Sequence, residues 1–209
     1  RGKFISFEGG EGAGKSTQIV LLEKFLREKG VETVRVREPG GTELSEKIRY
    51  LLKDFEADPP GSRSETMLFL AARAQLVEKG IIPALERGVW VLSDRFSDST
   101  IAYQGYGRKM PIETLFKMNE FVCSTAVPDI TFWLDLPVEK SRERLRRREK
   151  ELSSSADRIE RAGEDFHCKI RTGFEELARL FPGRIVRIDA SAGIEEIWGE
   201  ICSLVKPMI

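Results

Sequence analysis

The chain has 209 residues, and 34 Lys and Arg residues balance 34 Asp and Glu residues. A net charge of zero gives no general positive field for polymeric nucleic acid or an anionic membrane, so we expect neither as a partner. The length and the lack of a long Pro-, Ser- or Gly-rich stretch favour one α/β domain over residues 1–209. No apolar run approaches a membrane span and no cationic leader is present, so we expect a cytoplasmic location.

The first predicted element is a short buried strand at Phe4 to Phe7, and a helical apolar pattern follows at Gln18 to Lys29. Between them, residues 9–16 read GGEGAGKS and match the phosphate-binding pattern G-x-x-x-x-G-K-[ST]. A strand, a glycine turn and a helix N-terminus in series surround a phosphate with backbone N–H groups, whereas a chance glycine-rich turn lacks this context. We therefore predict that Gly9, Gly10, Glu11, Gly12, Ala13, Gly14, Lys15, Ser16 and Thr17 bind a nucleoside triphosphate, and the motif alone leaves open which one.

Four more short apolar runs alternate with helix-patterned segments, and they are Val31 to Val36, Val89 to Leu92, Ile130 to Leu136 and Ile185 to Ile188. This alternation predicts an α/β fold of three layers, with a five-stranded parallel sheet flanked by helices. Pro83 lies inside the helical pattern before the third strand, where a missing N–H should kink or end the helix.

Charged residues follow the predicted strands, where the ligands of an open parallel sheet collect. Asp94 and Arg95 come directly after the third strand, and Asp135 ends the fourth. A carboxylate after an apolar strand is typical of a Mg²⁺ ligand, so we predict a metal site made by Ser16 and Asp94. Arg95 is suited to a bidentate contact with a second, phosphate-bearing substrate. Ion pairs with surface groups are the structural alternative for both residues.

A charge-dense segment runs from Arg142 to Arg161 and is interrupted by the flexible stretch 152–156. A solvated helix face is one explanation of such a run. With a phosphate loop in the same chain, a lid of about residues 146–161 that carries arginines over a triphosphate is the other.

Two strings identify a family resemblance: EPGGT at residues 38–42 and DRFSDSTIAYQG at residues 94–105. Together with the phosphate loop they resemble the thymidylate kinases, and the similarity runs from Phe4 to about Val205. The resemblance implies a P-loop kinase fold and Mg²⁺-dependent transfer of the γ-phosphoryl group of ATP to dTMP, giving dTDP and ADP. It also implies a homodimer that packs helices near 68–76 and 116–122.

For the thymine base, the resemblance implies stacking on Phe69 and a hydrogen bond from Arg73 to a carbonyl. Helical spacing alone would make Phe69 a core residue. Thr100 and Gln104 match positions at the thymine edge, and Tyr103 matches the tyrosine beside the sugar 2′ carbon, where a ring disfavours a ribose hydroxyl.

For the dTMP phosphate and sugar, Arg95 matches the phosphate clamp, with Arg37 and Arg49 as further contacts. Glu11 is unexpected in a phosphate loop, because a carboxylate repels phosphate. The resemblance places an acid at this position near the sugar 3′-hydroxyl and the metal.

No arginine lies between Gly9 and Lys15, so the resemblance implies the bacterial arrangement, in which the lid supplies the catalytic arginine. Arg144, Arg148 and Arg158 lie in that region, and we favour the last two. The predicted catalytic residues are Lys15, Arg95, Arg148, Arg158 and Glu11.

Direct in-line transfer needs no covalent intermediate and no general base, because the acceptor phosphate is already ionised. The lone His167 is expected to be a surface or packing residue. A kinase for another nucleoside monophosphate or a deoxynucleoside is one rival. A nucleotide-switch GTPase or partitioning ATPase is another, although the guanine-reading N-K-x-D pattern and the partitioning-type lysine are missing.

Overall fold

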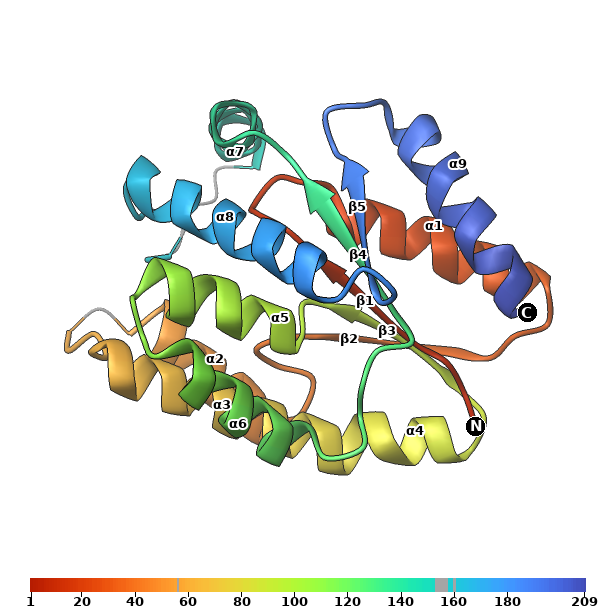
Figure 1. Ribbon diagram of the computed structural model, residues 1–209, viewed down its shortest axis with the longest axis horizontal. Coiled ribbons are helices and arrows are strands. Elements are labelled where there is room, and N and C mark those ends of the chain that lie inside the picture. The colour runs from red at the N-terminus through yellow and green to blue at the C-terminus, as the bar shows by residue number, and fades with distance from the viewer. Residues whose placement is uncertain (56, 153–157, 160) are drawn as a thin grey trace.

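The computed structural model describes residues 1–55, 57–152, 158–159 and 161–209, with the side chains of 148–152 excepted (Figure 1). Its centre is a five-stranded sheet with the order β2-β3-β1-β4-β5, in which every pairing is parallel. The strands are β1 (Phe4–Glu8), β2 (Thr33–Arg37), β3 (Trp90–Asp94), β4 (Ile130–Asp135) and β5 (Ile185–Asp189). The predicted α/β class and the five-stranded parallel sheet are confirmed.

Strand register brings the carboxyl ends of the strands to one edge. Asp94 at the end of β3 aligns with Phe7 of β1 on one side and Arg37 of β2 on the other. On the opposite side of the sheet order, Asp135 of β4 aligns with Asp189 of β5. The residues that follow these strands therefore share one edge, which is where the site described below lies.

One face of the sheet is covered by α1 (Lys15–Glu28) and α9 (Ile194–Val205), which lie together in Figure 1. Alternate residues of β1, Ile5 and Phe7, are fully buried against these helices. The alternation follows from the period of two along a strand, which sends successive side chains to opposite faces.

The other face carries most of the remaining helices, and Figure 1 shows α3, α4 and α6 on this side. They are α2 (Glu43–Lys53), α3 (Ser62–Leu76), α4 (Ile82–Glu86), α5 (Ser97–Thr100), α6 (Ile112–Cys123) and α8 (Glu164–Leu180). A further helix, α7 (Val138–Leu152), follows β4, and a short 3₁₀ turn, η3 (Lys206–Met208), ends the chain. Among the described residues, no helix is both long enough and apolar enough to cross a bilayer.

The helix that contains Pro83 does not end at the proline. A π-helical segment, η1 (Val77–Ile81), joins α3 to α4, and Pro83 lies in the first turn of α4. Proline is tolerated in a first turn because its missing N–H would have no partner there, and a π turn changes the hydrogen-bond register just before it. The helical conformation continues through Pro83, so the predicted end of the helix at this proline is wrong.

A second π-helical segment, η2 (Ile101–Gly107), continues α5 and packs extensively against α8. Gly173 of α8 permits this approach, because a Cβ there would lie 3.0 Å from the Ala102 Cα. Phe174 fixes the same junction: it is fully buried, stacks on Trp133 and meets Tyr103 edge to face. The position of Tyr103 thus depends on packing between η2, β4 and α8.

Asp135 at the end of β4 has a structural role. It accepts hydrogen bonds from Arg171 of α8, with a closest contact of 2.7 Å, and from Arg187 of β5 at 2.5 Å. Burial raises its pKa, but the two arginines outweigh burial and hold the pKa below its ordinary value. This carboxylate therefore joins β4, β5 and α8 at the edge of the sheet.

We predict that Phe174→Ala lowers the free energy of unfolding by about 3 to 5 kcal/mol, because it removes a fully buried ring and leaves a cavity. Urea unfolding followed by circular dichroism measures this change. Phe181→Ala is the matched control, since that ring is more than a third exposed, and it should cost much less. Equal losses for the two variants would contradict the role given to Phe174.

Candidate active site

The loop of residues 9–16, called the phosphate loop below, joins β1 to α1. Gly9 has a φ of 130°, and a Cβ there would lie 2.4 Å from the carbonyl oxygen of Leu134 in β4. Gly14 caps α1 with a φ of 91°, a left-handed conformation that glycine adopts without strain. The sequence therefore folds into a tight turn at the N-terminus of a helix, the geometry that binds phosphate.

Lys15 lies inside this loop. Its Nζ donates hydrogen bonds to the carbonyl oxygens of Gly9, at 3.2 Å, and Gly10, at 2.9 Å. Burial and the nearby Arg95 lower the pKa of Lys15, while Glu11 opposes them. The ammonium is thus held by the same loop that binds phosphate, close to where the phosphate oxygens of a nucleotide would lie.

Ser16 and Asp94, the two residues predicted to bind a metal ion, lie in hydrogen-bond contact. Because β3 pairs with β1, the Asp94 carboxylate lies next to the start of α1, and the Ser16 hydroxyl donates to its Oδ2 at 2.9 Å. A hydroxyl and a carboxylate are hard oxygen ligands of the kind that Mg²⁺ takes together with substrate phosphates. The described residues include no cluster of three or more His, Cys, Asp or Glu side chains that could hold a metal alone.

The phosphate loop opens into a polar cavity of about 1340 Å³ of empty space, called the triphosphate cavity below. Its walls bring together cations from several elements, including Arg37, Arg49, Arg144 and Arg147. Thr17 also lines it. This concentration of positive charge beside a phosphate loop suits a nucleoside triphosphate.

A second, more apolar cavity, of about 460 Å³ of empty space, adjoins the first and is called the base cavity below. Seven of the predicted dTMP contacts line it, and they are Glu11, Phe69, Arg73, Arg95, Thr100, Tyr103 and Gln104. Four residues line both cavities, and they are Glu11, Glu38, Lys53 and Arg95. The two cavities therefore meet at a charged boundary.

Arg95 forms the centre of this boundary. Its backbone has a φ of 71°, a left-handed conformation that is uncommon for a residue with a Cβ. Its guanidinium donates to the Gly9 carbonyl oxygen at 2.8 Å and to Glu11 Oε1 at 2.5 Å, and it lies over the Tyr103 ring. Burial would raise the pKa of Glu11, but Arg95 and Lys15 hold that pKa well below its ordinary value.

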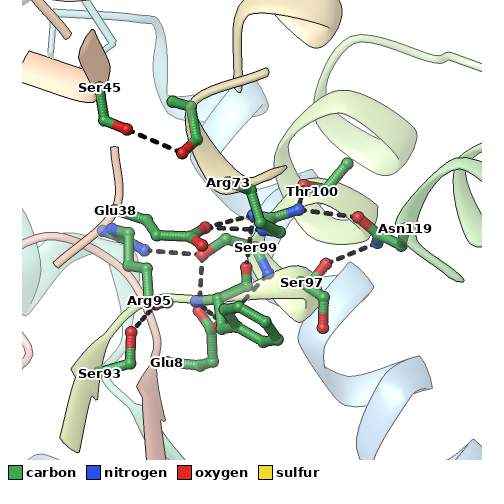
Figure 2. A network of polar contacts seen from close by, with 12 residues as sticks. Glu8, Glu38, Ser45, Arg73, Ser93, Arg95, Ser97, Ser99, Thr100 and Asn119 are labelled. Carbon is green, nitrogen blue, oxygen red and sulfur yellow. Dashed lines mark hydrogen bonds and ion pairs between the residues drawn. The ribbon is translucent and has the colours of Figure 1, made fainter. Parts of the chain in front are cut away.

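Glu8 supports the turn that carries Arg95, and sequence reasoning missed it. The fully buried carboxylate accepts hydrogen bonds from the Phe96 N–H at 2.8 Å and from the Ser99 hydroxyl at 2.6 Å (Figure 2). Burial and the charge of Asp98 raise the pKa of Glu8 to about 7. Its sequence signal was a lone glutamate at the end of an otherwise buried strand.

Arg73 is the centre of the network in Figure 2. Its Nε and Nη2 both donate to Glu38 Oε2, at 2.8 and 2.6 Å, and Nη2 also donates to the Phe96 carbonyl oxygen. Its Nη1 donates to Thr100 Oγ1 at 2.7 Å and to Asn119 Oδ1 at 2.8 Å. A guanidinium has five N–H donors, so all five have protein partners, and a thymine carbonyl would have to share one.

The remaining predicted base contacts differ in exposure. Phe69 is half-buried and packs on the hydrophobic core while it lines the base cavity, so the core and ligand interpretations both describe it. Thr100 Oγ1 accepts from Arg73, which leaves its hydroxyl proton for another acceptor. The buried Tyr103 hydroxyl has no hydrogen-bond partner among the described residues.

Arg37 and Arg49 lie at the rim of the triphosphate cavity and also make contacts within the protein. Arg37 pairs with Glu46 at 2.9 Å, and Arg49 donates to the Pro39 carbonyl oxygen at 3.0 Å. Their place on the wall is compatible with phosphate contacts from either substrate.

The segment predicted as a lid is only partly described. Arg144 of α7 donates to the carbonyl oxygens of Gly12, at 3.1 Å, and Ala190, at 3.0 Å, and so fixes α7 to the phosphate loop. Arg158 pairs with Glu65 of α3 at 2.6 Å. The side chain of Arg148 lies outside the described residues, so its predicted role stays a prediction.

Comparisons with known proteins agree with this geometry. Residues 7–201 match the family model described as "Thymidylate kinase". The chain belongs to the thymidylate kinase family. It is 46% identical to the thymidylate kinase of Thermosipho melanesiensis over 206 residues, covering 99% of this chain and 98% of the relative. It is also 46% identical to that of Fervidobacterium nodosum, covering 95% of each.

A solved thymidylate kinase structure from Ehrlichia chaffeensis superimposes with a TM-score of 0.79 at 35% identity, and 99% of each chain is covered. The P-loop kinase fold is therefore shown, and the family resemblance is confirmed. Sequence reasoning gave no role to Lys53 or Glu38, which line both cavities, or to Glu65 and Asn119. Glu38 lies in the family string EPGGT, whereas the other three carry no local signal.

We predict that Glu8→Gln changes how stability depends on pH. The folded pKa of Glu8 is about 7 against an ordinary value of 4.5, so the folded state holds the proton more tightly. The contribution of Glu8 to stability is therefore largest below pH 4.5 and is lost as pH rises towards 7. Relative to wild type, Glu8→Gln should gain up to about 3 kcal/mol between pH 5 and pH 8.

Urea unfolding at several pH values measures this difference. Glu43→Gln is the control, because it removes a carboxylate from an exposed ion pair with Lys47, and it should follow the wild-type profile. A difference between Glu8→Gln and wild type that stays constant with pH would contradict the raised pKa.

Proposed function

We propose that this protein is a dTMP kinase, which transfers the γ-phosphoryl group of Mg²⁺-bound ATP to dTMP and forms dTDP and ADP. The observation that carries the proposal is the meeting of the two cavities at Glu11, Glu38, Lys53 and Arg95. A triphosphate on the phosphate loop and a base between Phe69 and Arg73 would place donor and acceptor phosphates on either side of that boundary. Family membership supports the same reaction.

In this proposal, catalysis comes from positioning and from charge neutralisation. Lys15 and the N–H groups of the phosphate loop hold the β- and γ-phosphates, and Arg95 holds the phosphate of dTMP. Ser16 and Asp94 would hold Mg²⁺, which would supply positive charge to neutralise the phosphates. Glu11 lies against Arg95, and in this proposal its carboxylate would face the sugar 3′-hydroxyl and the metal.

The acceptor phosphate is ionised near neutral pH, so the chain needs no general base. His167 agrees with this, since it borders a different cavity behind the phosphate loop, together with Trp133 and Phe174. The lid arginines Arg148 and Arg158 would supply further positive charge in the transition state.

Base recognition would use the wall of the base cavity. Phe69 stacks on thymine, Thr100 and Gln104 contact its edge, and Arg73 shares an N–H with a carbonyl. Tyr103 packs beside the sugar and disfavours a 2′-hydroxyl. Arg37 and Arg49 would add phosphate contacts at the boundary.

We also propose a homodimer that acts in the cytoplasm. The helices expected at its interface are α3 and α6, and each carries a large exposed apolar side chain, Met67 with 54% and Phe121 with 87% exposure. Packing of these two helices against another subunit would bury both side chains.

A substrate panel tests the function. We expect the purified chain with Mg²⁺ and ATP to phosphorylate dTMP with the highest kcat/KM, dUMP less well, and dCMP, AMP and GMP hardly at all. A coupled assay for ADP, with thin-layer separation of the products, measures these rates. Preference for another monophosphate would favour the rival kinase, and rapid ATP hydrolysis without any acceptor would favour a nucleotide switch.

We predict that Arg148→Ala lowers kcat by about 10³-fold, because an arginine that a lid supplies to the site stabilises the charge of the transition state. Its affinity for dTMP, measured by calorimetry, should stay within about twofold of wild type. Arg95→Ala is the comparison, and it should weaken dTMP binding strongly because it removes the phosphate clamp. Loss of dTMP binding in Arg148→Ala with turnover intact would contradict the assignment.

A further inference from the structure

Glu65 of α3 is a buried carboxylate directly behind the base cavity. It is 1% exposed and does not line the cavity itself. Four hydrogen bonds converge on it: Gln104 Nε2 donates to Oε1 at 3.2 Å, Arg108 donates to both oxygens at 3.1 and 3.2 Å, and Arg158 donates to Oε2 at 2.6 Å. Its partners therefore come from η2 and from the end of the predicted lid.

The charge of Glu65 restricts what Gln104 can present to it. Burial would raise the pKa of Glu65, but Arg108 and Arg158 outweigh burial and lower it, so the group is ionised at neutral pH. An ionised carboxylate only accepts hydrogen bonds, and a glutamine amide has one donor end and one acceptor end. The NH₂ group of Gln104 must face Glu65, and its oxygen is then left for the base cavity, which Gln104 lines.

We propose that Glu65 is a positioning residue for base selectivity: it fixes the Gln104 amide with its oxygen toward the base, where that oxygen accepts a hydrogen bond from an N–H of the substrate. Thymine carries such a donor at N3, whereas cytosine has an unprotonated acceptor at N3. The inference rests on the proposed dTMP kinase function. It adds Glu65 as the residue that lets the site distinguish a protonated N3 from an unprotonated one.

The same carboxylate holds Arg158, the first described residue after 153–157, and Ile159 beside it lines the base cavity. Glu65 therefore contacts both Gln104, which lines the base cavity, and Arg158, at the end of the predicted lid. Removing one cation still leaves the other to keep Glu65 ionised, so only a change at Glu65 itself should free the Gln104 amide to turn over.

The test is the ratio of kcat/KM for dTMP to kcat/KM for dCMP. Glu65→Gln keeps the shape of the side chain but presents either a donor or an acceptor, so Gln104 can flip and offer its NH₂ group to cytosine N3. We expect the ratio to fall by at least about tenfold, the size of one hydrogen bond made or lost at a buried site. An unchanged ratio in a folded Glu65→Gln enzyme overturns the inference.

Two controls separate positioning from general damage. Arg108→Met removes a partner of the same carboxylate but leaves Arg158 and the charge in place, so it should keep the wild-type ratio. Gln104→Met removes the amide altogether, and adding Glu65→Gln to it should change the ratio no further. A fall of the ratio in Arg108→Met, or an additional fall in the double variant, contradicts action through Gln104.

If Glu65→Gln does not fold, NMR of the wild-type enzyme with bound dTMP gives the answer. Gln104 side-chain NH₂ protons with nuclear Overhauser contacts to Glu65 support the inference, and contacts to thymine overturn it. Failure of the proposed function gives a different result. In that case the wild-type enzyme itself does not phosphorylate dTMP, whereas failure of this inference leaves wild-type activity intact.

Discussion

The ion pair between Arg73 and Glu38 constrains the whole substrate side of the molecule. Both side chains are almost fully buried, at 2% and 5% exposure, and isolated charges would be very costly at that depth. Arg73 is tolerated because it donates five hydrogen bonds to four acceptor atoms, which come from different elements: the turn after β2, the turn after β3, and helices α5 and α6. The shape of the base cavity is thus tied to the pairing of one buried guanidinium.

The need to pair buried charges also explains why a carboxylate, Glu11, lies beside Arg95 in the active site. Glu11 accepts a hydrogen bond from the Arg95 guanidinium, and carbonyl oxygens of the phosphate loop accept hydrogen bonds from the Lys15 ammonium. Without these partners, the positive charges of Arg95 and Lys15 would repel each other in a buried site. In the proposed reaction, an incoming phosphate would replace these partners and would meet cations that the protein already holds in place.

Local patterns predicted the parts of the fold that are local. The strands, the phosphate loop and the pairing of Ser16 with Asp94 follow from apolar runs and one motif. The apolar residues Phe166, Ile170 and Phe174 of α8 recur at helical spacing, so this helix also has a local signal. Arg73 and Asn119 are 46 residues apart, and such contacts leave no local pattern in the sequence. The buried hydrogen-bond network could therefore not be predicted from the sequence.

Two arginines on either side of the undescribed stretch 153–157 are fixed to different cavities. Arg144 binds the phosphate loop through Gly12, and Arg158 binds Glu65 behind the base. The chain between these anchors is therefore tied at one end to the donor site and at the other to the acceptor site. If Arg148 acts as proposed, a cation between these anchors would respond to both substrates, as a charge that should act only when both are bound must. In the proposed reaction, the contacts of Arg144 and Arg158 would then influence when transfer occurs, as well as the arginine proposed to act in the transition state.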